Sequence, residues 1–123
     1  MQIKVEYRSG SQSSHLHLPK IGPVVARVLR CQDLFQGSLN LYAAMPIHFP
    51  DPARVLCAGE EWLFVPVIIE EKAVGLAARR PPPEAIEFIE VFACDKLAPR
   101  LGLEYHDEVT IRLLSGRYLS LAA

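Results

Sequence analysis

Ten prolines in a chain of 123 residues restrict the fold of this sequence more than any other feature. Proline has a fixed φ and no backbone N–H, so it interrupts helix interiors and the central strands of sheets. We therefore expect short elements joined by tight corners. A chain of this length forms a single domain, residues 1–123, and buries roughly two thirds of its unfolded surface, which is enough for a hydrophobic core.

Hydrophobic periodicity predicts about seven short strands. Ile3, Val5 and Tyr7 alternate with polar residues, a pattern typical of a half-buried strand. Residues 70–72, with the sequence Glu-Glu-Lys, are expected to form a hairpin turn. The segments with strand character are residues 2–7, 15–18, 38–42, 61–69, 73–78, 87–93, 109–114 and 118–121.

Two short helices complete the expected elements. Gly22-Pro23 opens the first, because proline suits a first helical turn, and an apolar stripe follows at residues 24–29. Asp95 is the expected N-cap of the second, which ends before Gly102. These elements predict a mainly β fold, a closed six- or seven-stranded β-barrel with two short helices, since closure leaves no edge strand. An α+β sandwich is the alternative.

Charge and cysteine content narrow the function classes. Thirteen basic and fourteen acidic residues give a net charge of −1, which argues against a nucleic-acid partner. Cys31, Cys57 and Cys94 are odd in number and widely spaced, so we expect buried thiols in a reducing compartment. The N-terminus lacks the apolar run of a signal peptide, and residues 63–69 fall far short of the ~20 residues that span a bilayer. A soluble, cytoplasmic protein with no membrane partner is expected.

Two stretches share their order and spacing with one known family. Residues 36–41 read Gln-Gly-Ser-Leu-Asn-Leu, and residues 87–93 read Glu-Phe-Ile-Glu-Val-Phe-Ala. Leu101-Gly102-Leu103 and Asp107-Glu108-Val109 follow. Together they resemble the archaeal CTP-dependent riboflavin kinases, which have a Gly-Thr-Leu-Asn strand, a Glu-Ile-Ile-Glu strand, a helix and a Gly-Asp-x-Val turn. The resemblance covers most of the chain and implies a riboflavin-kinase-like cradle-loop barrel.

The resemblance implies a magnesium site and a catalytic carboxylate. Ser38 occupies the position of a magnesium-ligating threonine in the family, and Asn40 that of the second protein ligand. Residues two apart on a strand point to one face, so both oxygens can reach one cation, and Mg²⁺ prefers such hard oxygen ligands. Glu90 matches the carboxylate that acts on the riboflavin 5′-hydroxyl, where it would orient the hydroxyl or accept its proton.

The resemblance also implies two segments that contact the nucleotide CTP. The first is the loop that cradles the phosphates, and the second lies at the start of the predicted second helix. The residues concerned are Gly10, Ser11, Gln12 and Ser13 in the loop, and Asp95, Lys96, Leu97 and Ala98 at the helix. This sequence departs from the family at three places. The loop keeps one glycine, Pro82 stands near a flavin-contacting threonine, and His106 replaces a glycine.

These observations lead to one principal hypothesis and two alternatives. The principal hypothesis is Mg²⁺-dependent phosphoryl transfer from CTP to riboflavin, which gives FMN. The first alternative is a non-catalytic barrel that binds a flavin, a nucleotide or another small molecule, which the departures favour. The second is a DNA-binding barrel of the swapped-hairpin type, whose final turn resembles residues 101–109 and which the near-neutral charge opposes.

Overall fold

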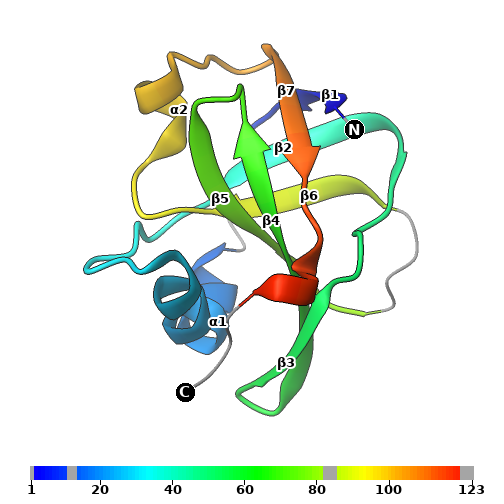
Figure 1. The fold of residues 1–123 in the computed structure, drawn as a ribbon. Coiled ribbons are helices and arrows are strands. Elements are labelled where there is room, and N and C mark those ends of the chain that lie inside the picture. Colours follow the sequence, from blue (N-terminus) through cyan, green and yellow to red (C-terminus); the bar gives the residue numbers. More distant parts are fainter. Residues whose placement is uncertain (1, 11–13, 82–85, 120–123) are drawn as a thin grey trace.

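The computed structural model describes residues 2–10, 14–81 and 86–119. Within these ranges the chain forms seven strands, two α-helices and a terminal 3-10 turn (Figure 1). In chain order the elements are β1 (Gln2–Tyr7), α1 (Ser14–Leu29), β2 (Leu39–Ile47), β3 (Ala53–Cys57), β4 (Glu60–Ile69), β5 (Ala73–Arg79), β6 (Ile86–Phe92), α2 (Leu97–Leu101), β7 (Glu108–Leu113) and η1 (Gly116–Tyr118).

Six of the strands close into an antiparallel barrel. The strand order is β3-β4-β5-β6-β2-β1-β7, and a further pairing between β4 and β7 joins the two ends of the six-stranded part. The seventh strand, β3, pairs with the first half of β4 and extends away from the barrel as a hairpin (Figure 1). The predicted closed barrel with two short helices is therefore confirmed, and the sandwich alternative is wrong.

Pro66 lies in β4 at the point where one neighbouring strand gives way to another. Pairing with β3 ends at Phe64, and pairing with β7 begins at Val67. On its other side Pro66 stays in register with Leu76 of β5. A residue without an N–H is tolerated here because the changeover leaves a gap in one ladder. The change of partner thus explains why β4 can contain a proline.

Two apolar clusters stabilise the barrel. One fills its interior and includes Leu41, Val65, Ile89 and Ile111, each at most 1% exposed. The other lies outside the barrel, where α1 packs on β4, β5 and β6. Its buried members are Leu18, Ile21, Val25, Cys57, Trp62, Phe64, Leu76, Ala78 and Phe92. Because β4 is covered on both faces, residues 62–65 are all buried, which accounts for the continuous apolar run in the sequence.

The first helix begins earlier than the sequence predicts. Residues 15–18, predicted as a strand, are helical, and Gly22-Pro23 lies inside α1 rather than at its start. Leu18, Ile21 and Val25 recur at helical spacing and are buried, whereas Pro19 and Pro23 lie on the exposed side. Packing of this apolar face offsets the hydrogen bonds that the two prolines remove.

Other local predictions have mixed outcomes. Gly102 ends α2 in the left-handed region with φ 68°, as predicted, and the 70–72 hairpin turn forms, with Lys72 N–H donating to Ile69 O at 3.0 Å. Asp95 is not the N-cap, because α2 begins two residues later, and its carboxylate instead pairs with Arg100 at 3.0 Å.

The ends of two predicted strands also differ. β2 continues through Pro46 to Ile47, with a register shift after Tyr42 that accommodates the proline. The predicted strand at residues 118–121 is wrong at its start, because Tyr118 lies in the 3-10 turn η1, and residues 120–121 are outside the described part. Neither helix of the described chain is long and apolar enough to cross a membrane.

A matched pair of leucine truncations tests this division between core and surface. Leu63 on β4 is 0% exposed, whereas Leu56 on the partner strand β3 is 74% exposed. We expect Leu63→Ala to lower the free energy of unfolding by about 2–5 kcal/mol, because it leaves a cavity. Leu56→Ala is the control and should change it by less than about 0.5 kcal/mol. Urea denaturation measures both, and equal losses would contradict the described packing.

Candidate functional site

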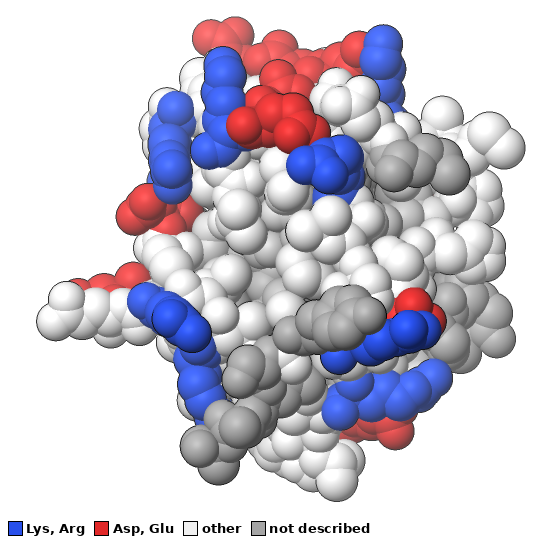
Figure 2. Space-filling view, in the orientation of Figure 1, with Lys and Arg blue, Asp and Glu red and all other residues white. Residues whose placement is uncertain are grey.

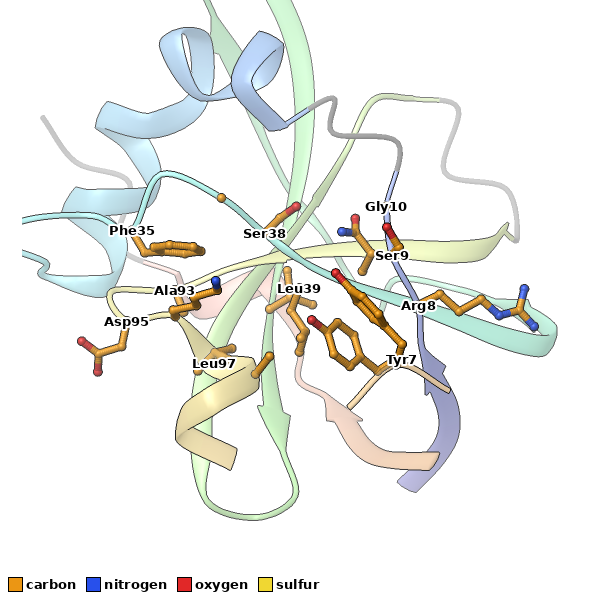
Figure 3. A pocket seen from close by; sticks show the side chains of 16 residues that line it. Tyr7, Arg8, Ser9, Gly10, Phe35, Ser38, Leu39, Ala93, Asp95 and Leu97 are labelled. Carbon is orange, nitrogen blue, oxygen red and sulfur yellow. The ribbon is translucent and has the colours of Figure 1, made fainter. Parts of the chain in front are cut away.

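The candidate site is a pocket of about 210 Å³ where three separate segments meet. The segments are the end of β1 with the residues that follow it, the start of β2, and the stretch from the end of β6 into α2 (Figure 3). Seven of the residues singled out in the sequence line this pocket: Gly10, Ser38, Asn40, Asp95, Lys96, Leu97 and Ala98. Ser11, Gln12 and Ser13, expected to contribute to the phosphate loop, lie outside the described residues, as does Pro82.

The pairing of β2 with β6 positions the polar residues of the site. Leu39 is in register with Val91, and both side chains are buried in the barrel interior. Asn40 is in register with Glu90, so their side chains leave the opposite face of the sheet as neighbours. Ser38, two residues before Asn40, shares that face. The predicted arrangement of Ser38 and Asn40 on one face is therefore confirmed, and both line the pocket.

Glu90 lies beneath the pocket rather than in its wall. It is 6% exposed and does not line the cavity. Each of its carboxylate oxygens has a partner: Ser38 Oγ donates to Oε2 at 3.0 Å, and His17 Nδ1 lies 3.1 Å from Oε1. The His17 ring in turn meets the Trp62 ring edge-on, with centroids 5.1 Å apart. A buried carboxylate requires such partners, because an unpaired charge is costly to bury.

The sequence did not identify His17 as part of this site. The residue was assigned to a short strand, where no contact with Glu90 is expected. The signal that could have found it is the helical spacing of Leu18, Ile21 and Val25, which places α1 on the barrel next to β6. Residues 17 and 90 are brought together only by this packing, since they are 73 positions apart.

Gly10 allows the chain after β1 to approach Asn40 closely. A Cβ atom at this position would lie 2.2 Å from Asn40 Nδ2 and 2.5 Å from its Cγ. Only glycine fits there without moving the asparagine side chain. Gly10, the one glycine of the predicted phosphate loop, therefore packs against Asn40, a predicted metal ligand.

The basic residues at the pocket differ in whether their charge is already paired with an acidic side chain. Arg8 extends away from the other labelled side chains in Figure 3, pairs with Glu6 at 2.7 Å and stacks over the ring of Tyr42. The hydrogen bond from Arg8, followed by that from His106, lowers the pKa of Glu6. Lys96 is exposed, lines the pocket and forms no ion pair with any described residue. Lys96 is thus the cation that an anionic ligand would meet.

An aromatic pair borders the pocket beside β1. Tyr7 and Tyr105 lie with ring centroids 5.0 Å apart. Burial, and then the neighbouring Tyr105, raises the pKa of Tyr7, so its phenol stays a neutral hydrogen-bond donor at neutral pH. On another side Phe35 lies over Gly37, where a Cβ would come within 2.7 Å of the ring. The pocket therefore combines apolar ring surfaces with polar groups at Ser38, Asn40 and Lys96.

Charged side chains elsewhere are largely paired with partners that are distant in the sequence. Arg112 binds Glu71 at 2.6 Å and Lys20 binds Glu60 at 2.8 Å, and each cation lowers the pKa of its partner carboxyl. Figure 2 shows acidic and basic side chains interspersed on the face in view. This distribution agrees with the near-neutral net charge and gives that face no continuous basic stripe of the kind that binds DNA.

A disulfide joins the end of α1 to the segment between β6 and α2, two of whose residues, Ala93 and Asp95, line the pocket. Cys31, just after α1, is bonded to Cys94, just after β6, with Cα atoms 5.4 Å apart. The expectation of three buried thiols is right for Cys57, which is 3% exposed and whose pKa burial raises, and wrong for the other two. Their separation of 63 residues gave no signal for pairing. The cysteine count consequently no longer argues for a reducing compartment.

The oxygen groups at the pocket wall are chemically suited to a hard cation such as Mg²⁺. Among residues 2–10, 14–81 and 86–119, no three His, Cys, Asp or Glu side chains gather closely enough to hold a metal ion. Ser38 and Asn40 offer two neutral oxygens at the pocket wall. Mg²⁺ commonly takes few protein ligands and completes its shell with water and phosphate oxygens, so this pair is compatible with it.

Comparison with known proteins adds no assignment to this geometry. The sequence matches no model of a known protein family, and a search of curated proteins gave no match either. The class of the protein is accordingly defined by its fold, a closed six-stranded antiparallel barrel with one additional strand and two helices.

The disulfide makes the stability of this region sensitive to reductant. Its closed loop of 63 residues restricts the unfolded chain, and loss of the bond should lower the free energy of unfolding by about 2–4 kcal/mol. We expect dithiothreitol to lower the thermal midpoint of the wild-type protein. The double variant Cys31→Ser/Cys94→Ser should have the lower midpoint with or without reductant. A wild-type midpoint insensitive to complete reduction would contradict this contribution.

Proposed function

We propose that this protein transfers a phosphoryl group from CTP to the 5′-hydroxyl of riboflavin in a Mg²⁺-dependent reaction. The single observation that carries the proposal is the convergence of the residues singled out by the resemblance. Gly10, residues 38–40 and residues 95–98 are far apart in the sequence and line one pocket, with Glu90 directly behind Ser38. This convergence of three separate segments supports the proposal.

The cation is proposed to bind at Ser38 and Asn40. Asn40 lies at the start of β2 and Ser38 immediately precedes it, and both residues line the pocket. When bound, Mg²⁺ neutralises charge on the transferring phosphoryl group and orients it. Gly10 supports the site because its bare Cα leaves the position of the Asn40 side chain undisturbed.

The nucleotide is proposed to lie along the segment that leads into α2. Lys96 supplies an unpaired positive charge at the pocket wall, which favours a phosphate. Tyr7 can donate a hydrogen bond from its neutral phenol. Leu97 and Ala98 add apolar surface of the kind on which a base can rest. The combination is suited to a ligand with an anionic part and a flat apolar part.

Glu90 is proposed to act on the acceptor hydroxyl. In the transfer, the hydroxyl oxygen forms a bond to the terminal phosphorus of CTP and the bond from that phosphorus to its bridging oxygen breaks. CDP leaves, FMN forms, and the hydroxyl proton is accepted by the carboxylate. A carboxylate oxygen has two lone pairs, so Glu90 retains acceptor capacity beside its bonds to Ser38 and His17.

A second candidate function is ligand binding without transfer. It is favoured by one observation, the 6% exposure of Glu90, whose two oxygens are already engaged and which does not line the pocket. In that case the barrel would bind a flavin, a nucleotide or a related small molecule, and Glu90 would serve to hold the site together.

One combined assay separates these candidates. Thermal midpoints are measured with riboflavin, FMN, CTP or ATP, each with and without Mg²⁺, and FMN formation is followed by chromatography. A ligand at 100 times its dissociation constant stabilises the fold by about 2.7 kcal/mol, which shifts the midpoint measurably. Stabilisation by CTP together with FMN formation supports the kinase. Stabilisation without turnover supports the binding barrel, and the absence of any shift contradicts both.

Substitutions at the pocket test the individual roles. Asn40→Ala removes a proposed metal ligand and is expected to abolish Mg²⁺-dependent FMN formation while the thermal midpoint stays close to that of the wild type. Glu90→Gln is expected to lower kcat more than it raises KM, because it removes the proton acceptor and leaves the pocket wall in place. Gln2→Ala, at an exposed position of β1, is the control. Normal turnover by Asn40→Ala would remove the metal assignment.

A further inference from the structure

Three polar side chains from three different elements form one hydrogen-bonded chain behind the pocket. His17 comes from α1, Glu90 from β6, and Ser38 immediately precedes β2. Glu90 is almost fully buried between the other two, whereas His17 has 31% of its side chain exposed and Ser38 reaches the cavity. The chain therefore runs from the surface of α1 to the wall of the pocket.

The number of hydrogens on Ser38 determines what this residue can offer to a ligand. A serine hydroxyl has one hydrogen and two lone pairs, and an ionised carboxylate only accepts hydrogen bonds. Since Ser38 Oγ lies 3.0 Å from Glu90 Oε2, its hydrogen is directed to Glu90. Only the oxygen lone pairs then remain for the pocket. In this state Ser38 can bind a cation or accept a hydrogen bond, but it cannot donate one to a phosphate oxygen.

We infer that His17 is a positioning residue that acts through Glu90 to set Ser38 as an acceptor toward the pocket, so that this position selects a divalent cation rather than an anionic group. The inference deepens the proposed function and rests on it for the identity of the cation. The two ends of the pocket would then bind different groups, a cation at one and phosphate oxygens at the other. The cation belongs at Ser38 and Asn40, whereas phosphate oxygens without a metal belong at Lys96, whose ammonium group only donates.

His17 acts through Glu90 and does not line the pocket. Its Nδ1 atom is placed to donate to Glu90 Oε1, either as the imidazolium or as the neutral tautomer with hydrogen on Nδ1. This bond holds one carboxylate oxygen and leaves the other facing Ser38. The packing of Leu18 and Ile21 in the outer apolar cluster fixes α1 on the barrel, and the contact with Trp62 fixes the ring. Without His17, Oε1 of the buried Glu90 carboxylate would have no polar partner, and the carboxylate would turn toward water.

The experiment uses Mn²⁺ alone as a paramagnetic probe of the cation position. The full chain is labelled with ¹⁵N, and the broadening of each amide signal is followed as Mn²⁺ is added at sub-stoichiometric concentration. In the wild type we expect selective broadening at Ser38, Leu39 and Asn40. The spectrum itself reports whether each variant is folded, so a failure to fold is not mistaken for a loss of binding.

Four variants separate positioning from metal ligation. Ser38→Ala removes the ligand itself, Glu90→Met removes the acceptor at similar volume, and His17→Leu removes the donor to Glu90. His17→Gln keeps an N–H donor and is the conservative variant. For the first three variants we expect that about tenfold more Mn²⁺ is needed to produce the same broadening, which corresponds to the loss of one hydrogen bond to a charged group. His17→Gln should show the broadening at the wild-type Mn²⁺ concentration.

A second histidine–glutamate pair provides the control. His106 Nδ1 lies 3.0 Å from Glu6 Oε2, nearly the same geometry as His17 and Glu90, but neither residue lines the pocket. His106→Leu should leave broadening at Ser38 unchanged. If His17→Leu and Glu90→Met bind Mn²⁺ like the wild type while Ser38→Ala does not, the inference is wrong and the metal site stands. If the wild type shows no selective broadening at Ser38 and Asn40, the magnesium part of the proposed function fails and the inference fails with it.

Discussion

The site of this protein depends on the register between β2 and β6. These strands are about 50 residues apart in the sequence, and their pairing places Leu39 beside Val91 and Asn40 beside Glu90. The first pair belongs to the barrel core and also lines the pocket, whereas the second lies on the outer face, where Asn40 lines the pocket and Glu90 meets His17 of α1. A shift of one residue in either strand would exchange the two faces, burying polar groups and exposing apolar ones. The hydrophobic core therefore fixes the register of the two strands that carry these polar residues.

The barrel and its site also depend on helix α1, which packs on the outside of the barrel. Barrel strands are usually half-exposed, yet β4 is buried on both faces because α1 covers it. That packing also brings His17 to Glu90, and the helix ends near Cys31, whose disulfide to Cys94 joins α1 to the segment between β6 and α2. One helix thus supports the site at three places, through apolar burial, a hydrogen bond to a buried carboxylate and a covalent bond.

The sequence predicted the barrel well because alternation in strands is a local property. Residues 2–7 and 109–114 show it clearly, and the apolar run at residues 61–69 is equally local; the strands form at all three places within a residue or two. The helix start was missed because Pro19 and Pro23 argue locally against a helix, while the packing that outweighs them depends on residues far along the chain. The roles of His17 and Cys31 were missed for the same reason, since their partners are 73 and 63 positions away. Ser38, Asn40 and residues 95–98 were brought to one pocket as the resemblance implied, whereas the binding of CTP, riboflavin and Mg²⁺ there is a proposal.

The most direct test of this account is the mapping of nucleotide binding on the ¹⁵N-labelled protein by chemical-shift changes, with CTP added in the presence of Mg²⁺. We predict that the largest changes fall on Gly10, Ser38, Asn40 and residues 95–98, which line one pocket. Changes confined to the separate groove beside Lys4, Tyr42 and His106 would contradict it, as would the absence of any change at saturating nucleotide. The first result would locate a nucleotide in the pocket that β2, β6 and α2 build together.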